Sequence, residues 1–148
     1  MVSRTRIIEW LRAGGLDPDA EPSGQYQAAL DPQGAEELGR ELAERLRDLD
    51  LSTIVVWRDV SDVVLAHIVA RELRGRVALT FDAEGLVEHL GPIEPGARVA
   101  VVTGVVDDPL GLAAVVAYVE RQQGEVLAVG ALTGSQEFLA GPPVVSLL

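Results

Sequence analysis

The sequence predicts an α/β protein with a doubly wound parallel sheet of about five strands and flanking helices. Short runs of β-branched and apolar residues predict the strands, at 52–57, 76–81, 98–103, 125–132 and 144–148. Segments 61–74 and 108–122 have apolar residues at helical spacing. Because parallel neighbours need crossover connections, this alternation favours a parallel sheet covered on both faces. The 148 residues suit a single domain.

The N-terminal region, 1–30, predicts a helix and a connecting arm, followed by the α/β core, 31–148. An apolar stripe over residues 3–12 predicts the helix, and a pair of glycines after it predicts its end. The segment 16–30 is rich in Pro, Gly and Asp, so we expect a partly extended arm.

Asp31 and Pro32 begin the next predicted helix. The Asp31 carboxylate is expected to accept hydrogen bonds from the first-turn amides, and proline at the first helical position loses no bond there. Leucines at helical spacing predict one buried stripe, formed by Leu38, Leu42, Leu46 and Leu49. The charged residues on the other faces, including Glu41 and Arg45, predict a solvated surface with weak charge pairs.

The ligand crevice of a doubly wound sheet lies beyond the C-terminal ends of its strands. The segments to inspect for a site are therefore those that follow Trp57, Phe81, Thr103 and Leu132. The last of them, 133–143, is bounded by Gly and Pro and carries no recognisable chemistry.

The first of these segments contains Trp57, Arg58 and Asp59. As a ligand loop, it would offer an indole for stacking, a guanidinium for an anion and a carboxylate acceptor. As a purely structural turn, Ser61 or Asp59 would cap the next helix, and Arg58 would pair with a neighbouring carboxylate. His67 lies inside that helix without a catalytic partner, so we interpret it as a helix-face or subunit-interface residue.

The second segment, 82–97, is long for a connection in an α/β protein, which predicts a lid or a dimer contact. The alternative is a short amphipathic helix formed by Leu86, Val87 and Leu90. His89 has no assignable role, and the acidic residues near it lack the spacing of a metal site.

The third segment, VTGVVDDPLG at 102–111, is a strand-to-helix turn of the kind that often holds a phosphate. Such a site needs free backbone amides, yet Asp107, Asp108 and Pro109 stand where those amides would be wanted. Proline has no amide, and carboxylates repel phosphate. Asp108 followed by proline instead predicts a well-formed helix start, with the Asp108 side chain accepting the first-turn amides.

Together these elements resemble the type I phosphoribosyltransferase family, most closely orotate phosphoribosyltransferase, over nearly the whole chain. SGQYQAALD, 23–31, is similar to the Ser-Gly segment after the family's first helix. IVVWRDVSDVVLAHIVAREL, 54–73, is similar to its strand, pyrophosphate loop and helix. VAVVTGVVDDPLG, 99–111, falls on its signature strand and phosphate loop. The resemblance implies a phosphoribosyltransferase-like fold and a homodimer.

The functional positions of this resemblance are degenerate. Where the family has two adjacent acids that hold the ribose of phosphoribosyl diphosphate, this chain has Thr103 and Gly104. Acidic residues occupy the start of the phosphate loop, and Ser61 and Asp62 replace the glycine pair of the pyrophosphate loop. The chain also contains no lysine, which the orotate enzymes use around a mobile catalytic loop.

These departures favour a protein that has lost phosphoribosyl diphosphate binding and catalysis and acts as a binding, scaffolding or regulatory module. No catalytic residue is assigned. The crevice candidates for ligand binding are Trp57, Arg58, Asp59, Thr103, Gly104, Asp107, Asp108 and Gly111. The alternative is a divergent phosphoribosyltransferase or nucleotide-binding enzyme in which Asp59, Asp107 and Asp108 hold a divalent metal. No cofactor is expected, with Mg²⁺ only if activity is retained.

Composition restricts the partners. The net charge of −11 argues against nucleic acid, because an acidic surface repels phosphate backbones. The absence of Cys excludes disulfides and thiolate chemistry. No apolar run reaches the length of a signal peptide core or a membrane span, so we expect a cytoplasmic protein without membrane contact. A homodimer with a small phosphate-free ligand or a protein partner fits these restrictions.

Overall fold

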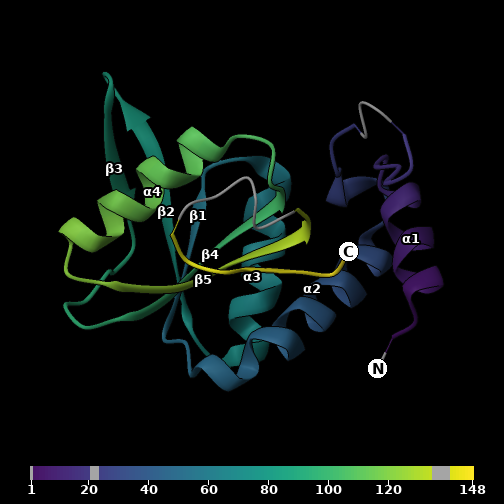
Figure 1. Ribbon diagram of the computed structural model, residues 1–148, viewed down its shortest axis with the longest axis horizontal. Helices are drawn as coiled ribbons and strands as arrows, with labels where there is room; N and C mark the ends of the chain where they lie inside the picture. The colour runs from purple at the N-terminus through teal and green to yellow at the C-terminus, as the bar shows by residue number, and fades with distance from the viewer. Residues whose placement is uncertain (1, 21–23, 135–140) are drawn as a thin grey trace.

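The computed structural model describes residues 2–20, 24–134 and 141–148, and these contain one mixed sheet of six strands (Figure 1). The strands are β1 Thr53–Trp57, β2 Arg76–Ala83, β3 Leu86–Leu90, β4 Arg98–Val105, β5 Glu125–Thr133 and β6 Val144–Ser146. Their order across the sheet is β3-β2-β1-β4-β5-β6, and every neighbouring pair is parallel except β2 and β3. The predicted α/β fold is confirmed, with one strand more than the sequence predicts.

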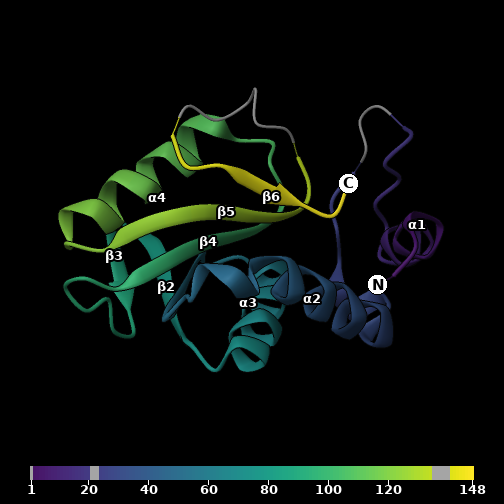
Figure 2. The same cartoon turned by 60° about the horizontal axis from the view of Figure 1, so that its bottom comes forward.

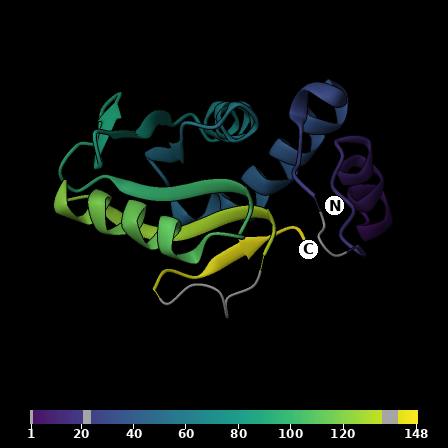
Figure 3. The same cartoon turned by 90° about the horizontal axis from the view of Figure 1, so that it is seen from above.

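Helices cover both faces of the sheet (Figures 2 and 3). They are α1 Arg4–Ala13, α2 Pro32–Leu46, α3 Val60–Leu73 and α4 Pro109–Arg121, with short 3-10 turns η1 Ala28–Leu30 and η2 Arg47–Leu49. One buried cluster joins α2 and α3 to the sheet, and the second lies under α4. The alternating apolar strands therefore form the middle of three layers. Within the described ranges, no helix is long and apolar enough to cross a membrane.

The N-terminal region packs on the core of its own chain. α1 lies outside α2, away from the sheet, as Figure 3 shows. The arm then returns toward α3, where the Ala28 amide donates to the buried Ser61 hydroxyl at 3.2 Å. The Tyr26 ring packs closely against Gly14. A Cβ added at this glycine would be only 2.3 Å from a ring carbon. A side chain at position 14 would therefore push the arm away.

α2 begins at Pro32, as its sequence predicts, but the Asp31 side chain makes no capping hydrogen bond. The predicted cap is wrong at this one position, although the helix start is right. The leucine stripe is buried, and Leu49 is partly buried at the end of η2. Glu41 is only 9% exposed, so the predicted solvated face is wrong at this position, whereas its predicted charge pair with Arg45 is present at 3.6 Å.

The segment after Phe81 contains a β-hairpin, so the alternative of a short helix is wrong, while the lid or dimer contact stays a prediction. β2 continues to Ala83, and β3 pairs with it antiparallel. Glu84 and Gly85 form the turn with φ of 54° and 85°, and the Gly85 amide donates to Asp82 Oδ1 at 2.9 Å. Two consecutive positive φ angles match the twist of a two-residue hairpin.

Candidate functional site

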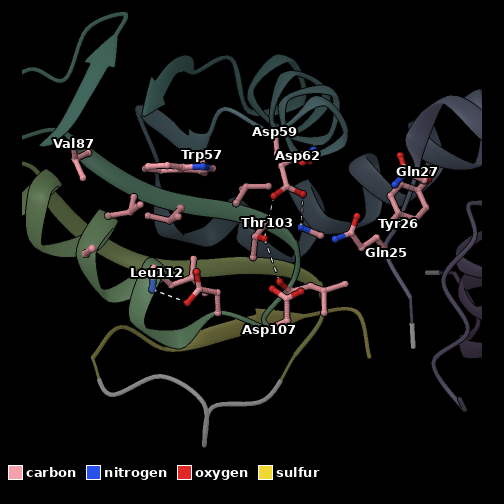
Figure 4. Close-up of a pocket in the computed structure, with 18 residues that line it drawn as sticks. Gln25, Tyr26, Gln27, Trp57, Asp59, Asp62, Val87, Thr103, Asp107 and Leu112 are labelled. Atoms are coloured by element: carbon pink, nitrogen blue, oxygen red, sulfur yellow. Dashed lines mark hydrogen bonds between the residues drawn. The ribbon is translucent and has the colours of Figure 1, made fainter. Parts of the chain in front are cut away.

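A pocket of about 400 Å³ lies at the C-terminal ends of β1 and β4 (Figure 4). This is the place where the chain order across the sheet reverses, since β1 lies between β2 and β4. Crevices at such switch points are the usual ligand sites of doubly wound sheets. The pocket is lined by Gln25, Tyr26, Gln27, Trp57, Asp59, Asp62, Val87, Val101, Val102, Thr103, Gly104, Val105, Asp107, Asp108, Gly111, Leu112, Ala114 and Val115.

Seven of the eight crevice candidates line this pocket, and Arg58 does not. The Arg58 guanidinium instead lies over the Phe81 ring, 4.6 Å from its centroid. It therefore lies away from the position that the ligand-loop interpretation needs, and within the described part of the chain it forms no ion pair with a carboxylate. A cation–π contact of this kind holds the guanidinium against β2, outside the pocket.

Asp59 is the N-cap of α3. Its Oδ1 accepts the amides of Ser61 and Asp62, each at 3.1 Å. The structural interpretation of this turn is thus confirmed for Asp59. The hydroxyl of Ser61 is used by the arm, so the turn joins α3 to the N-terminal region as well.

Asp108 plays the same part at α4. Its Oδ1 accepts the Gly111 amide at 2.9 Å, and Pro109 is the first residue of the helix. The predicted helix start is confirmed. An amide that would face a phosphate in a phosphate loop is thereby bound to a carboxylate of the chain itself. A Cβ added at Gly111 would lie against the Asp108 carboxylate, so a larger residue there would require this side chain to shift.

Asp62 is the site residue that the sequence did not reveal. From the first turn of α3 it reaches the end of β4, where Oδ1 accepts the Gly104 amide at 2.9 Å and Oδ2 accepts the Thr103 hydroxyl at 3.2 Å. Burial raises the pKa of its carboxyl, and repulsion from Asp59 and Asp107 adds to the rise, while the two hydrogen bonds oppose it. Asp62 therefore connects the two halves of the switch point.

The charge of the pocket is strongly negative. Asp59, Asp62, Asp107 and Asp108 line it, and none of the described lining residues is Arg, Lys or His. The ranges outside the description, 1, 21–23 and 135–140, contain no such residue in the sequence either. Asp107 is exposed and makes no hydrogen bond or ion pair with any described residue. The chain itself thus leaves this charge uncompensated inside the pocket.

Two further parts of the lining were not predicted. The arm contributes Gln25, Tyr26 and Gln27, and the β-hairpin contributes Val87. Both contacts depend on the tertiary fold and have no local sequence signal. Burial, with a smaller contribution from the charge of Asp31, raises the pKa of Tyr26 to about 12.

The two histidines lie outside the pocket lining. His67 is exposed on α3, in keeping with its interpretation as a helix-face residue. His89 lies outside the lining, and its Nδ1 is hydrogen-bonded to the Tyr118 hydroxyl of α4. Within residues 2–20, 24–134 and 141–148, no group of three or more His, Asp or Glu side chains is placed to hold a metal ion.

Known proteins match this chain in three-dimensional structure and not in sequence. No family model matches the chain, and no curated protein is similar to it in sequence. An adenine phosphoribosyltransferase from Rhodothermus marinus superposes with a TM-score of 0.76 at 17% identity, over 97% of this chain and 98% of that one. The fold is phosphoribosyltransferase-like.

Two other solved structures share this phosphoribosyltransferase-like fold with bound phosphate compounds. An adenine phosphoribosyltransferase from Trypanosoma brucei, in complex with AMP, pyrophosphate and ribose-5-phosphate, has a TM-score of 0.68 at 13% identity, over 93% of this chain and 72% of that one. A hypothetical protein from Neisseria gonorrhoeae with bound ppGpp has a TM-score of 0.57 at 15% identity, over 77% and 80%. The resemblance to phosphoribosyltransferases is confirmed at the level of the fold, and the orotate branch stays a prediction.

Proposed function

We propose that this phosphoribosyltransferase-like protein has lost phosphoribosyl diphosphate binding and catalysis, and that it acts as a binding module for a ligand without phosphate. The observation that carries the proposal is the charge of the pocket, which four aspartates line without a basic side chain among the described lining residues. Two phosphate groups could not be accommodated there without a large electrostatic cost.

A simple estimate gives the size of that cost. A phosphate charge about 4 Å from one carboxylate is repelled by about 4 kcal/mol at an effective dielectric constant of about 20. More than one carboxylate borders the same space, and Asp107 has no ion pair with the described residues to reduce its field. Since a micromolar complex has a binding free energy of about −8 kcal/mol, repulsion of this size removes most of it.

The backbone amides at the starts of α3 and α4 offer little compensation, because most of them are already engaged or absent. Phosphate loops bind through free amides at a helix N-terminus. Here the Gly111 amide at α4 is bound to Asp108, and the amides of Ser61 and Asp62 at α3 are bound to Asp59. Pro109 has no amide to donate. Both helix N-termini that face the switch point thus already hold an anion belonging to the chain.

Isothermal titration calorimetry with phosphoribosyl diphosphate and Mg²⁺ tests this function. We expect no saturable heat, and no rise in the melting temperature of the protein with either compound or both. Orotate and adenine, added with the same mixture, should give no product. A saturable micromolar response to phosphoribosyl diphosphate would contradict the proposal.

The alternative of an enzyme with a metal held by Asp59, Asp107 and Asp108 has less support. Asp59 and Asp108 each turn back onto the helix that they cap, so two of the three carboxylates already have amide partners. Titration with Mg²⁺ or Mn²⁺ alone distinguishes the two proposals, because the metal alternative needs saturable binding that is lost in Asp107→Asn.

A further inference from the structure

The pocket has an acidic end near the arm and, opposite, an end with apolar side chains, beside which Asp108 caps α4. Figure 4 shows Asp59 and Asp62 near the arm side of the pocket, while Trp57 and Val87 lie at the opposite side. Leu112 of α4 also lies toward that apolar end. Such a division favours a ligand that carries its charge at one end and an apolar group at the other.

The four aspartates of the lining have no cationic partner among the described side chains. The ion pairs of the described residues all join side chains outside the pocket lining. Of the four carboxylates, Asp62 has both oxygens hydrogen-bonded, and Asp59 and Asp108 each have one oxygen engaged by a helix amide. Asp107 has neither oxygen engaged by a described residue. Asp107 is therefore the carboxylate most open to a ligand, while Asp59 and Asp108 each keep one oxygen without a described partner.

The apolar end contains an aromatic face. Trp57 ends β1 with 40% of its surface exposed, which is unusual for so large an apolar side chain on a central strand. Tryptophan is the best aromatic partner for a cation and also stacks on planar groups. The volume of about 400 Å³ lies at the small end of the range for ligand pockets.

We propose that this pocket binds a small organic cation, in which an amidine, guanidine or amine is attached to an aromatic or branched apolar group. The cationic group contacts Asp107 in the field of the other carboxylates, and the apolar group lies against Trp57 and Leu112. This inference rests on the proposed function, since it requires a pocket that does not hold a phosphate.

The test uses three probes of one shape and three charges, titrated into the full chain by calorimetry and by ¹⁵N-edited NMR. Benzamidine is cationic, benzamide is neutral and benzoate is anionic. Benzamidine should bind saturably, should shift the amide signals of residues around the pocket, and should bind about tenfold more tightly than benzamide. Benzoate should not bind.

Matched variants locate the contacts. Asp107→Asn removes the charge of an exposed side chain without breaking a hydrogen bond to a described residue, and it should weaken benzamidine binding about tenfold. Asp48→Asn removes the same charge from an exposed position in η2, outside the pocket, and should leave the affinity unchanged. Trp57→Leu keeps an apolar group without the aromatic face and should weaken binding about threefold.

Several results would overturn the inference. They are equal binding of benzamide and benzamidine, tighter binding of benzoate, equal losses in the Asp107 and Asp48 variants, and no saturable binding of benzamidine. Displacement of benzamidine by Mg²⁺ alone at comparable concentration would assign the pocket to a metal instead. The proposed function fails separately, by binding phosphoribosyl diphosphate, so a protein that binds neither compound refutes the cation and leaves the loss of phosphate binding in place.

Discussion

The two turns that border the pocket both begin a helix with an aspartate cap, but the second aspartate of each turn has a different number of hydrogen bonds. At α3, Asp59 caps the helix, and the next acid, Asp62, reaches across to β4 and is hydrogen-bonded at both oxygens. At α4, Asp108 caps the helix, while Asp107 beside it has no partner among the described residues. One turn therefore fixes the wall of the pocket, and the other presents a free charge to it.

This difference separates stability from binding. A carboxylate that satisfies buried backbone groups contributes to the fold and is costly to remove. An exposed carboxylate without a partner contributes little to stability, and its charge is available to a ligand. Substitutions at the four aspartates of the pocket should thus change the free energy of unfolding by different amounts.

The largest effect is expected at Asp62. Asp62→Ala leaves the buried Gly104 amide without its acceptor, which should lower the free energy of unfolding by about 1–3 kcal/mol. Asp62→Asn keeps an acceptor for that amide and removes a charge that burial disfavours, so it should be at least as stable as the wild type at neutral pH. Urea denaturation of the three proteins measures this. Equal destabilisation of both variants would show that the charge, and not the hydrogen bond, matters.

The caps come next. Asp59→Ala should cost about 1–2 kcal/mol and Asp108→Ala about 1 kcal/mol, because the first carboxylate accepts two amides and the second accepts one. Thermal and urea unfolding of both variants checks the order, with Asp59→Asn and Asp108→Asn as controls that restore a capping oxygen. The comparison between the two turns would be weakened if Asp108→Ala were the more destabilising.

The stability of the protein should depend on pH through the ionisation of Asp62. Its pKa is raised in the folded state, so the folded protein holds this proton more tightly than the unfolded chain. The resulting stabilisation is present below the ordinary carboxyl pKa of about 4 and is lost as the pH rises through the raised value. The stability of Asp62→Asn minus that of the wild type should therefore grow from about pH 3 toward neutral pH. Parallel pH profiles would contradict this.

The smallest effect on stability is expected at Asp107. Asp107→Asn should change the free energy of unfolding by less than about 0.5 kcal/mol, as for other exposed positions without partners. Relief of its repulsion with Asp62 makes a slight gain the expected direction. Urea denaturation beside Asp48→Asn measures it, and a loss above about 1 kcal/mol would mean that Asp107 has a structural partner.

The sequence predicts most of the sheet because its signals are local. β-branched runs mark the strands at β1, β4 and β5, and Asp108 followed by Pro109 marks the start of α4. β3 was not predicted, because LVEHL is short and alternating and because its turn is Glu-Gly instead of the common Asn-Gly or Asp-Gly. The amphipathic pattern of five residues fits a helix and a strand equally well.

The site is predicted less completely because its contacts are distant in sequence. The bonds from Asp62 to Thr103 and Gly104 span 41 and 42 positions and exist only because β1 and β4 are neighbours. Arg58 illustrates the opposite error, since its position beside Trp57 suggested an anion donor and its side chain lies on Phe81. Residue type and strand position locate the crevice, but the direction of each side chain needs the fold.

The most direct measurement of the central claim is the ³¹P NMR line width of ribose 5-phosphate titrated with the wild-type protein and Mg²⁺. The carboxylates at Asp107 and Asp108 are proposed to exclude phosphate from this pocket, so the line should stay narrow up to millimolar protein. Saturable broadening that is competed by inorganic phosphate would contradict the account, because it would place a phosphate where the structure has two carboxylates.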